Sequence, residues 1–103
     1  MDLEKGVFPE PECSREAAKA WLEREFGASL MVVPDTPGHY YPPHSHDCHE
    51  IIVGIEGQIV FRAEGRELAI GAGEVLYLPE GTVHEATVGP AGCEYLIGHS
   101  FSA

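Results

Sequence analysis

The stretch GHYYPPHSHDCHEIIVGIEG, residues 38–57, concentrates histidines directly before a run of β-type residues. It holds four of the chain's six histidines, at positions 39, 44, 46 and 49, and Glu50 follows them. On a strand alternate side chains share a face, so His44, His46 and Glu50 point the same way. Imidazole nitrogens and a carboxylate oxygen suit divalent first-row metals. The pattern therefore predicts a ligand cluster on one face of a strand.

A further candidate ligand, His84, ends the segment GEVLYLPEGTVH at residues 73–84. Pro79 and Gly81 favour a sharp turn just before it, which would bring His84 in from a different strand. In an apolar protein interior, unpaired imidazoles and a carboxylate are costly unless something compensates them, and a metal ion does so. The alternative is that hydrogen bonds satisfy each histidine in a polar pocket without a metal.

The two segments resemble the two sequence motifs of the cupin superfamily. Residues 38–57 match every fixed position of the first motif, and residues 73–88 match the second except at its last position, where Val88 replaces the usual Asn. The resemblance covers about residues 28–101 of the chain. The matching positions are Gly38, His44, His46, Glu50 and Gly57 in the first motif, and Gly73, Pro79, Gly81 and His84 in the second.

This resemblance implies a small antiparallel β-barrel of the jelly-roll type, with His44, His46, Glu50 and His84 on one divalent metal ion inside it. Because the Asn of the second motif is not a ligand in the family, Val88 leaves this expectation intact. Cupins include dioxygenases, isomerases, decarboxylases and lyases, and the fold does not choose among them. The identity of the metal stays open among iron, manganese, nickel and zinc.

The first motif also resembles the sensing barrel of AraC-type transcription regulators. This second resemblance implies a non-catalytic barrel that binds a small molecule or a metal without turnover. Those regulators carry a helix-turn-helix domain behind the barrel, whereas this sequence shows no basic helical pair, so such a regulator would act through a partner. Whether the chain is an enzyme therefore stays open.

Short β-type runs follow one another after Gly27, with tight turns between them. We expect about eight strands, with hairpin turns at Glu56–Gly57 and Glu64–Gly65. Short antiparallel strands in so small a chain must close into a barrel or a sandwich to hide their edges, which predicts an all-β fold. The expected strands are residues 29–33, 39–41, 50–55, 58–63, 67–70, 75–78, 84–88 and 93–97.

Residues 1–27 are predicted to form an N-terminal arm and a short helix, and residues 28–103 the cupin barrel. Ser14 can cap a helix over Arg15–Phe26, which carries one apolar stripe, and Gly27 supplies a natural stop. A helix of about 12 residues is not stable alone in water. Its stripe must therefore lie on the outside of the barrel or on a second subunit.

The strand at residues 50–55 carries apolar side chains on both faces, with Ile52 and Gly54 on one face and Ile51, Val53 and Ile55 on the other. One face would point into the barrel, and the other needs cover. Cover by a second subunit predicts a homodimer. Cover by the helix of the same chain is the alternative.

Length and composition describe one compact domain, with 103 residues of which 44% are hydrophobic. The formal net charge of −11 opposes binding to nucleic-acid phosphates or anionic lipid headgroups. The chain lacks a bilayer-length apolar run and a signal-peptide layout, so we expect a cytoplasmic protein. The expected partners are a small-molecule ligand and a second copy, and neither nucleic acid nor membrane. Three widely spaced cysteines predict reduced thiols.

The inward face of residues 58–63 decides which ligands the barrel can take. If Phe61 points inward, Ile59 and Ala63 join it while Arg62 points outward, which leaves the pocket without a cation. Phosphorylated sugars become less favoured substrates, because no guanidinium is placed to hold a phosphate. No role is assigned to Cys48, His39, His49 and His99. Cys48 could lie near the metal, and His99 could line the barrel mouth.

Overall fold

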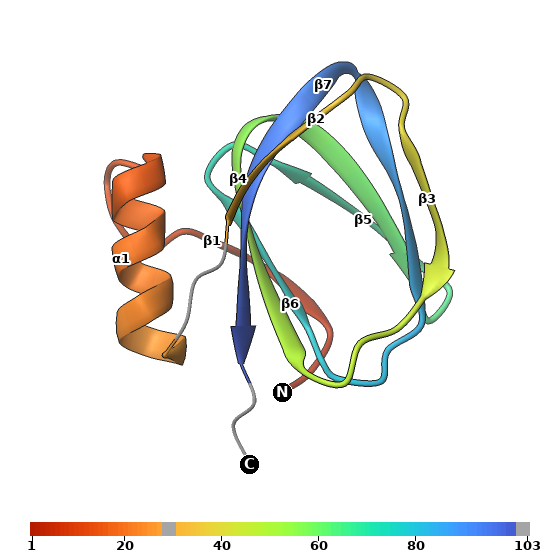
Figure 1. Ribbon diagram of the computed structural model, residues 1–103, viewed down its shortest axis with the longest axis horizontal. Helices are drawn as coiled ribbons and strands as arrows, with labels where there is room; N and C mark the ends of the chain where they lie inside the picture. The colour runs from red at the N-terminus through yellow and green to blue at the C-terminus, as the bar shows by residue number, and fades with distance from the viewer. Residues whose placement is uncertain (28–30, 101–103) are drawn as a thin grey trace.

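Antiparallel strands form one continuous sheet that curls round a core (Figure 1). The computed structural model describes residues 1–27 and 31–100, so Ser29 and Leu30 of the first expected strand lie outside the described residues. The predicted all-β fold with one short helix is confirmed. The elements are β1 (Glu4–Val7), α1 (Arg15–Phe26), β2 (Met31–Asp35), β3 (Tyr40–His44), β4 (His49–Ala63), β5 (Arg66–Gly71), β6 (Glu74–Leu78) and β7 (His84–Ser100).

The two long strands β4 and β7 hold the sheet together. They pair with each other from His49 opposite Ser100 to Ala63 opposite His84. On its other edge, β4 pairs first with β6 and then with β5, while β7 pairs first with β3 and then with β2. Because each long strand changes neighbours midway, the sheet folds over on itself and encloses an interior.

The hairpin expected at Glu56–Gly57 is wrong, because the chain bends there without reversing. Residues 50–55 and 58–63 are two halves of β4, and register shifts on both sides of Glu56–Gly57 mark an irregularity in its pairing with β7. Such bulges bend a strand while its pairing continues. Residues 84–88 and 93–97 are likewise joined in β7, so the eight expected strands merge into fewer and longer ones.

The second expected hairpin, at Glu64–Gly65, is confirmed as the link between β4 and β5. Its two central residues have positive φ angles of 52° and 72°. A two-residue turn with both φ angles positive matches the right-handed twist of the flanking strands. Residues 72–73 connect β5 to β6, and residues 79–83 connect β6 to β7.

The inward face of β4 is the one expected from alternation. Ile59, Phe61 and Ala63 are buried in the interior cluster together with Ile52. Arg62 points to the outside, where its Nε lies 2.8 Å from Oε1 of Glu85. The barrel interior is therefore lined mainly by apolar side chains. The guanidinium of Arg62, which alternates with them along β4, is held on the outside.

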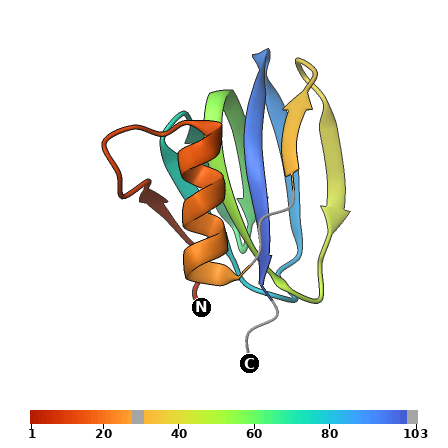
Figure 2. The ribbon, with the colours of Figure 1, turned by 60° about the vertical axis from the view of Figure 1, so that its left-hand side comes forward.

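The predicted helix is confirmed and covers the outer face of β4. The hydroxyl of Ser14 accepts a hydrogen bond from the Ala17 N–H at 3.1 Å, and Gly27 ends the helix with a φ of 80°. Leu22 is fully buried in a second apolar cluster that contains Ile51 and Val53, and Figure 2 shows the helix lying against that face of the sheet. Because the chain covers this face itself, the face gives no argument for a homodimer, which stays a prediction.

The N-terminal segment, predicted to be an arm, contributes the strand β1 to the sheet. This strand pairs antiparallel with β6, with Glu4 opposite Tyr77 and Val7 opposite Glu74. Lys5 Nζ also lies 3.0 Å from Glu74 Oε2. Residues far apart in the sequence are thereby joined at this edge of the sheet.

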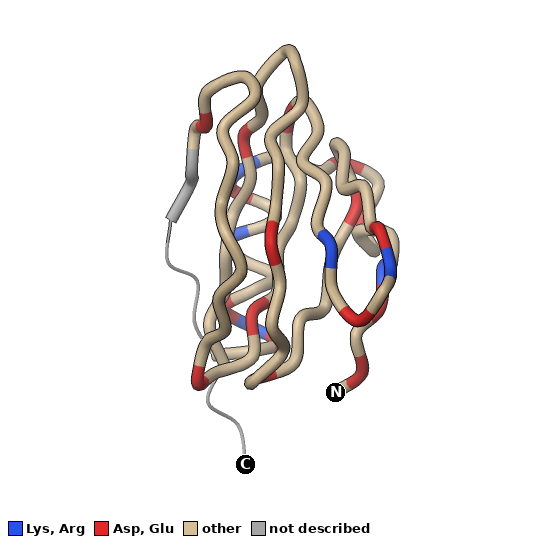
Figure 3. The backbone as a smooth tube through the Cα atoms, turned by 90° about the vertical axis from the view of Figure 1, so that its right-hand side faces the viewer, with Lys and Arg blue, Asp and Glu red and all other residues tan. Residues whose placement is uncertain are grey.

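The surface carries the acidic excess of the sequence. Figure 3 shows acidic residues at more places along the backbone than basic ones, in line with a net charge of −11. Within residues 1–27 and 31–100, the one helix is too short and too polar to cross a membrane.

Candidate metal centre and ligand cavity

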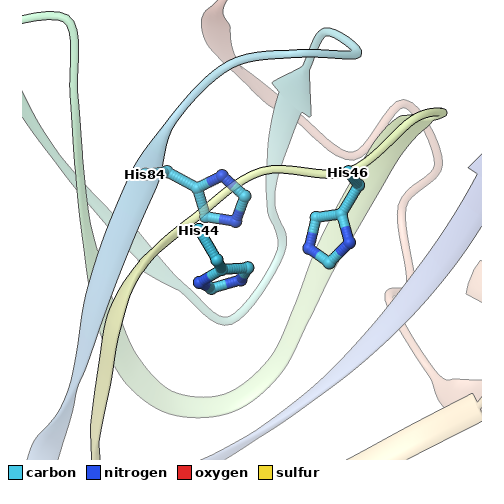
Figure 4. A group of neighbouring side chains, drawn as sticks. All are labelled: His44, His46 and His84. Atoms are coloured by element: carbon cyan, nitrogen blue, oxygen red, sulfur yellow. The ribbon is translucent and has the colours of Figure 1, made fainter.

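Three of the four predicted metal ligands come together at one end of the barrel (Figure 4). His44 ends β3 and lies directly opposite His84, which begins β7, while His46 is in the loop after β3. Their candidate ligand atoms all lie within 4.8 Å of one another. The ring centroids of His44 and His84 are 4.3 Å apart, and those of His44 and His46 are 4.9 Å apart. This spacing allows one ion to contact all three imidazoles.

Two of the three imidazoles are held by backbone carbonyl groups. Nδ1 of His44 lies 2.7 Å from the carbonyl oxygen of Pro42, and Nδ1 of His84 lies 2.9 Å from that of Thr82. A carbonyl oxygen only accepts, so each Nδ1 must carry the hydrogen. The lone pair of each neutral ring is then on Nε2, where it is free to bind a metal.

His84 is the most deeply buried of the three, with 3% of its surface exposed. Burial lowers the pKa of His84, and the neighbouring rings of His44 and His46 lower it further, against the opposing effects of Thr82 and Glu50. A lowered pKa favours the neutral imidazole, which is the form that binds metals. The burial of His84 therefore favours the form that serves as a ligand.

The fourth predicted ligand, Glu50, lies beside the histidine group and not within it. Its carboxylate is 5% exposed, and Oε1 is 3.5 Å from Nε2 of His46. The other oxygen, Oε2, is 2.8 Å from Nε2 of His99. One carboxylate oxygen thus faces the histidine group, while a further imidazole holds the other.

His99, for which the sequence suggests only a place at the barrel mouth, is therefore part of this polar cluster. It lies on β7 directly opposite Glu50 on β4. The alternation Tyr95, Ile97, His99 along the last strand was the available signal, because alternate residues share a face and the first two pack in the interior. The contact itself depends on the pairing of two strands that are distant in sequence, which no local pattern reveals.

The other unassigned residues lie outside the histidine group. His49 accepts a hydrogen bond on Nδ1 from the Glu80 N–H at 3.0 Å, which ties the start of β4 to the loop between β6 and β7. His39 is exposed, and its ring packs edge-on against Tyr41. Cys48 is buried, and burial raises the pKa of its thiol, so it stays protonated and a poor ligand at neutral pH.

A cavity of about 270 Å³ opens beside the histidines. Its volume is near the lower end of the range for small-molecule sites, roughly 300–1,000 Å³. The described residues that line it include no Lys or Arg, as the sequence predicted. They are Tyr41, His44, His46, Glu50, Ile52, Ile59, Phe61, His84, Ala86, Tyr95 and Ile97.

The fold and the site define a small cupin-type domain, and solved structures support this class. A DUF861 family protein from Thermotoga maritima matches with a TM-score of 0.66 at 15% identity, covering 95% of this chain and 99% of that protein. The cupin domain of Cnp3 from Schizosaccharomyces pombe matches with a TM-score of 0.64 at 16% identity, covering 73% of this chain and 63% of the other. The predicted resemblance to cupins is confirmed.

The family follows from the sequence itself. The family model described as AraC-like ligand binding domain matches residues 26–97, and the chain belongs to this family. The match spans both histidine motifs and the strands between them. It covers the barrel and leaves out most of the N-terminal segment and the helix.

A lyase is among the more similar solved structures. The DMSP lyase DddQ from Ruegeria pomeroyi DSS-3 is 28% identical over 70% of this chain, with a TM-score of 0.62. This chain spans only 39% of that lyase and less than two thirds of the Cnp3 domain. No curated protein matches the chain.

Proposed function

We propose that the chain binds one divalent transition metal, iron, manganese, nickel or zinc, through His44, His46, His84 and Glu50, and a small organic molecule in the adjoining cavity. The observation that carries this proposal is the convergence of three imidazoles, with ligand atoms within 4.8 Å, beside that cavity. Three nitrogens and one carboxylate oxygen form a donor set that first-row divalent metals accept.

The surroundings of the site support the same proposal. Backbone carbonyls leave the Nε2 lone pairs of His44 and His84 available, and Glu50 adds negative charge next to His46. A metal held there supplies a Lewis acid with positions open to a ligand oxygen. The buried apolar side chains of Ile52, Ile59 and Phe61 line the rest of the cavity.

The proposal covers two versions of the function. In the first, the metal-bound molecule is converted, in a dioxygenase-, isomerase- or lyase-type reaction, which the likeness to a lyase from Ruegeria supports. In the second, the barrel binds the molecule without turnover, which the description of the family as a ligand-binding domain supports. Both versions use the same metal centre, and they differ only in whether product forms.

The metal centre is tested by mass spectrometry of protein purified without added metal or chelator. We expect about one metal ion per wild-type chain and the loss of most of it in His84→Ala and in Glu50→Ala, because each substitution removes one of four donors. The matched control is His39→Ala, since His39 is exposed and outside the group. Unchanged metal content in both site variants, folded as judged by circular dichroism, would rule out the assigned ligands.

Turnover is tested on the metal-loaded protein with a panel of diketones, thiols and phenols, and with an oxygen electrode. Product formation or oxygen consumption that disappears in His84→Ala supports the enzyme. A molecule of the panel that binds and returns unchanged supports the binding module.

A further inference from the structure

The cavity has a second polar end, formed by the hydroxyl groups of two tyrosines. Tyr41 lies three residues before His44 on β3, and Tyr95 lies four residues before His99 on β7. A strand rises about 3.3 Å per residue, so these tyrosines are roughly 10 Å or more from the histidine end. Both tyrosines line the same cavity as the histidines. A ligand held at the histidine end would therefore have the two phenol groups at the far end of the same cavity.

Asp35, outside the cavity lining, accepts hydrogen bonds from the hydroxyl groups of both tyrosines. Its Oδ2 accepts a short hydrogen bond from the Tyr41 hydroxyl and a longer one, at 3.3 Å, from the Tyr95 hydroxyl. Its Oδ1 accepts the N–H of Thr36 at 3.0 Å. A carboxylate only accepts, so each phenol that bonds to it acts as a donor. The two hydroxyls also form a hydrogen bond with each other. The pair can still offer a ligand the phenol lone pairs that these hydrogen bonds do not use.

Raised pKa values keep the hydroxyl protons of Tyr41 and Tyr95 on their oxygens at neutral pH. Burial, the largest cause, and the charge of Asp35 both raise the pKa of Tyr41 and of Tyr95, while the hydrogen bond between the two hydroxyls raises the pKa of Tyr95 and lowers that of Tyr41. Burial and the charge of Asp35 also raise the pKa of Cys93, beside Asp35, to about 11. This end of the cavity therefore holds neutral hydroxyls backed by a negative charge at neutral pH.

We propose that Tyr41 and Tyr95 are specificity-determining residues, which select a ligand that carries a hydroxyl or amine N–H at the end remote from the metal. The inference rests on the proposed function, because the metal fixes the other end of the ligand. An apolar end would leave the remaining phenol lone pairs without a ligand partner in a cavity lined largely by apolar side chains, which is unfavourable. An anionic end would meet Asp35 without a cation to balance it, since the described lining contains none.

The test uses zinc-loaded protein and carboxylates of matched chain length as probes. Each length is presented with three termini: a hydroxyl (4-hydroxybutyrate to 6-hydroxyhexanoate), an ammonium (4-aminobutyrate to 6-aminohexanoate) and a methyl group (pentanoate to heptanoate). Affinities are measured by isothermal titration calorimetry. We expect at least one length to bind roughly five- to tenfold more tightly with a donor terminus than with a methyl terminus, the effect of one hydrogen bond.

Three single variants separate this role from a general effect on the barrel. Tyr41→Phe and Tyr95→Phe remove one phenol oxygen each, and we expect each to reduce the preference for the donor terminus to within about twofold. Tyr40→Phe is the control, because the Tyr40 hydroxyl is bound to Glu85 on the outside of the barrel. This control should keep the full preference.

Zinc uptake, measured first, separates the two proposals. Failure of wild-type protein to take up zinc contradicts the proposed function. Normal zinc uptake with equal affinity for donor and methyl termini, or with no binding of any probe, overturns the role of the tyrosines and leaves the metal centre standing. A donor preference that persists in both phenylalanine variants overturns it as well.

Discussion

His99 and Glu50 face each other across β7 and β4, with Nε2 of the histidine 2.8 Å from Oε2 of the glutamate. The other glutamate oxygen, Oε1, is directed to His46 at 3.5 Å. The carboxylate is therefore fixed between two imidazoles and cannot rotate freely. Groups that hold a metal ligand in this way reduce the entropy that the ligand loses when a metal binds.

Replacing His99 by Phe should weaken metal binding without removing a direct ligand. We expect the affinity for zinc, measured by competition with a chromophoric chelator, to fall about tenfold, which is typical for the loss of such an outer partner. His99→Gln should keep more of the affinity than His99→Phe, because its amide N–H can still donate to Glu50.

A double-mutant cycle decides whether His99 acts through Glu50. In a Glu50→Gln background, the carboxylate that His99 holds is gone, so His99→Phe should change the zinc affinity by less than about twofold. If His99→Phe costs the same factor in both backgrounds, His99 contacts the metal itself and the positioning role is wrong.

Much of the fold follows from local patterns in the sequence. The helix at Arg15–Phe26, its cap at Ser14 and its stop at Gly27 are all local features, and the structure confirms each. The predicted hairpin at Glu56–Gly57 is wrong for a physical reason. A Glu-Gly pair between two β-type runs is as suited to a bulge as to a turn. Only the continued pairing of both halves of β4 with β7 distinguishes the two, and that pairing is not local.

The residues of the site also fall into those that local sequence patterns predict and those that only long-range strand pairing brings in. His44 and His46 are close in sequence, and His84 belongs to a recognisable second motif, so all three were predicted and the structure brings them together. Asp35 and His99 act through contacts between strands far apart in the chain. Whether Glu50 completes a metal site stays a prediction, because its place beside His46 is compatible with binding and does not test it.

Gly54 should tolerate no side chain, because β4 runs very close to the end of β5 at that point. A Cβ on Gly54 would lie 2.0 Å from the carbonyl oxygen of Gly71 and 2.8 Å from its carbonyl carbon. Both are backbone atoms, so relief requires the strands to move apart. We expect Gly54→Ala to lower the free energy of unfolding, measured by urea denaturation, by at least about 2 kcal/mol.

The control for this substitution is Gly6→Ala on β1. A Cβ there would meet only a ring carbon of Tyr77, at an ordinary contact distance of 3.5 Å. Its free energy of unfolding should change by less than about 1 kcal/mol. Equal effects of the two substitutions would show that the close approach of Gly54 and Gly71 does not govern the stability of this region.

The free energy of unfolding should depend on pH through Glu74, which lies on β6 beside the edge strand β1. Its Oε1 accepts the N–H of Gly71 at 2.8 Å, and Lys5 lies 3.0 Å from its Oε2; the N–H is the larger of the two causes that lower the pKa of Glu74 below 4.5. A carboxyl whose pKa is lowered by folding stabilises the folded state when it is ionised. That contribution is complete above the unfolded pKa and is lost as the pH falls through the lower folded value.

Glu74→Gln should therefore be less stable than the wild type at pH 7, by no more than about 1 kcal/mol because the ion pair with Lys5 is partly exposed. The difference in the free energy of unfolding should shrink as the pH falls below about 4.5 and vanish once Glu74 is protonated in both states. Urea denaturation at a series of pH values measures this difference. Glu12→Gln, at an exposed position of the N-terminal segment, is the control and should show no such trend. A difference between Glu74→Gln and wild type that stays constant down to pH values of about 2 would mean that the charge of Glu74 does not stabilise the edge.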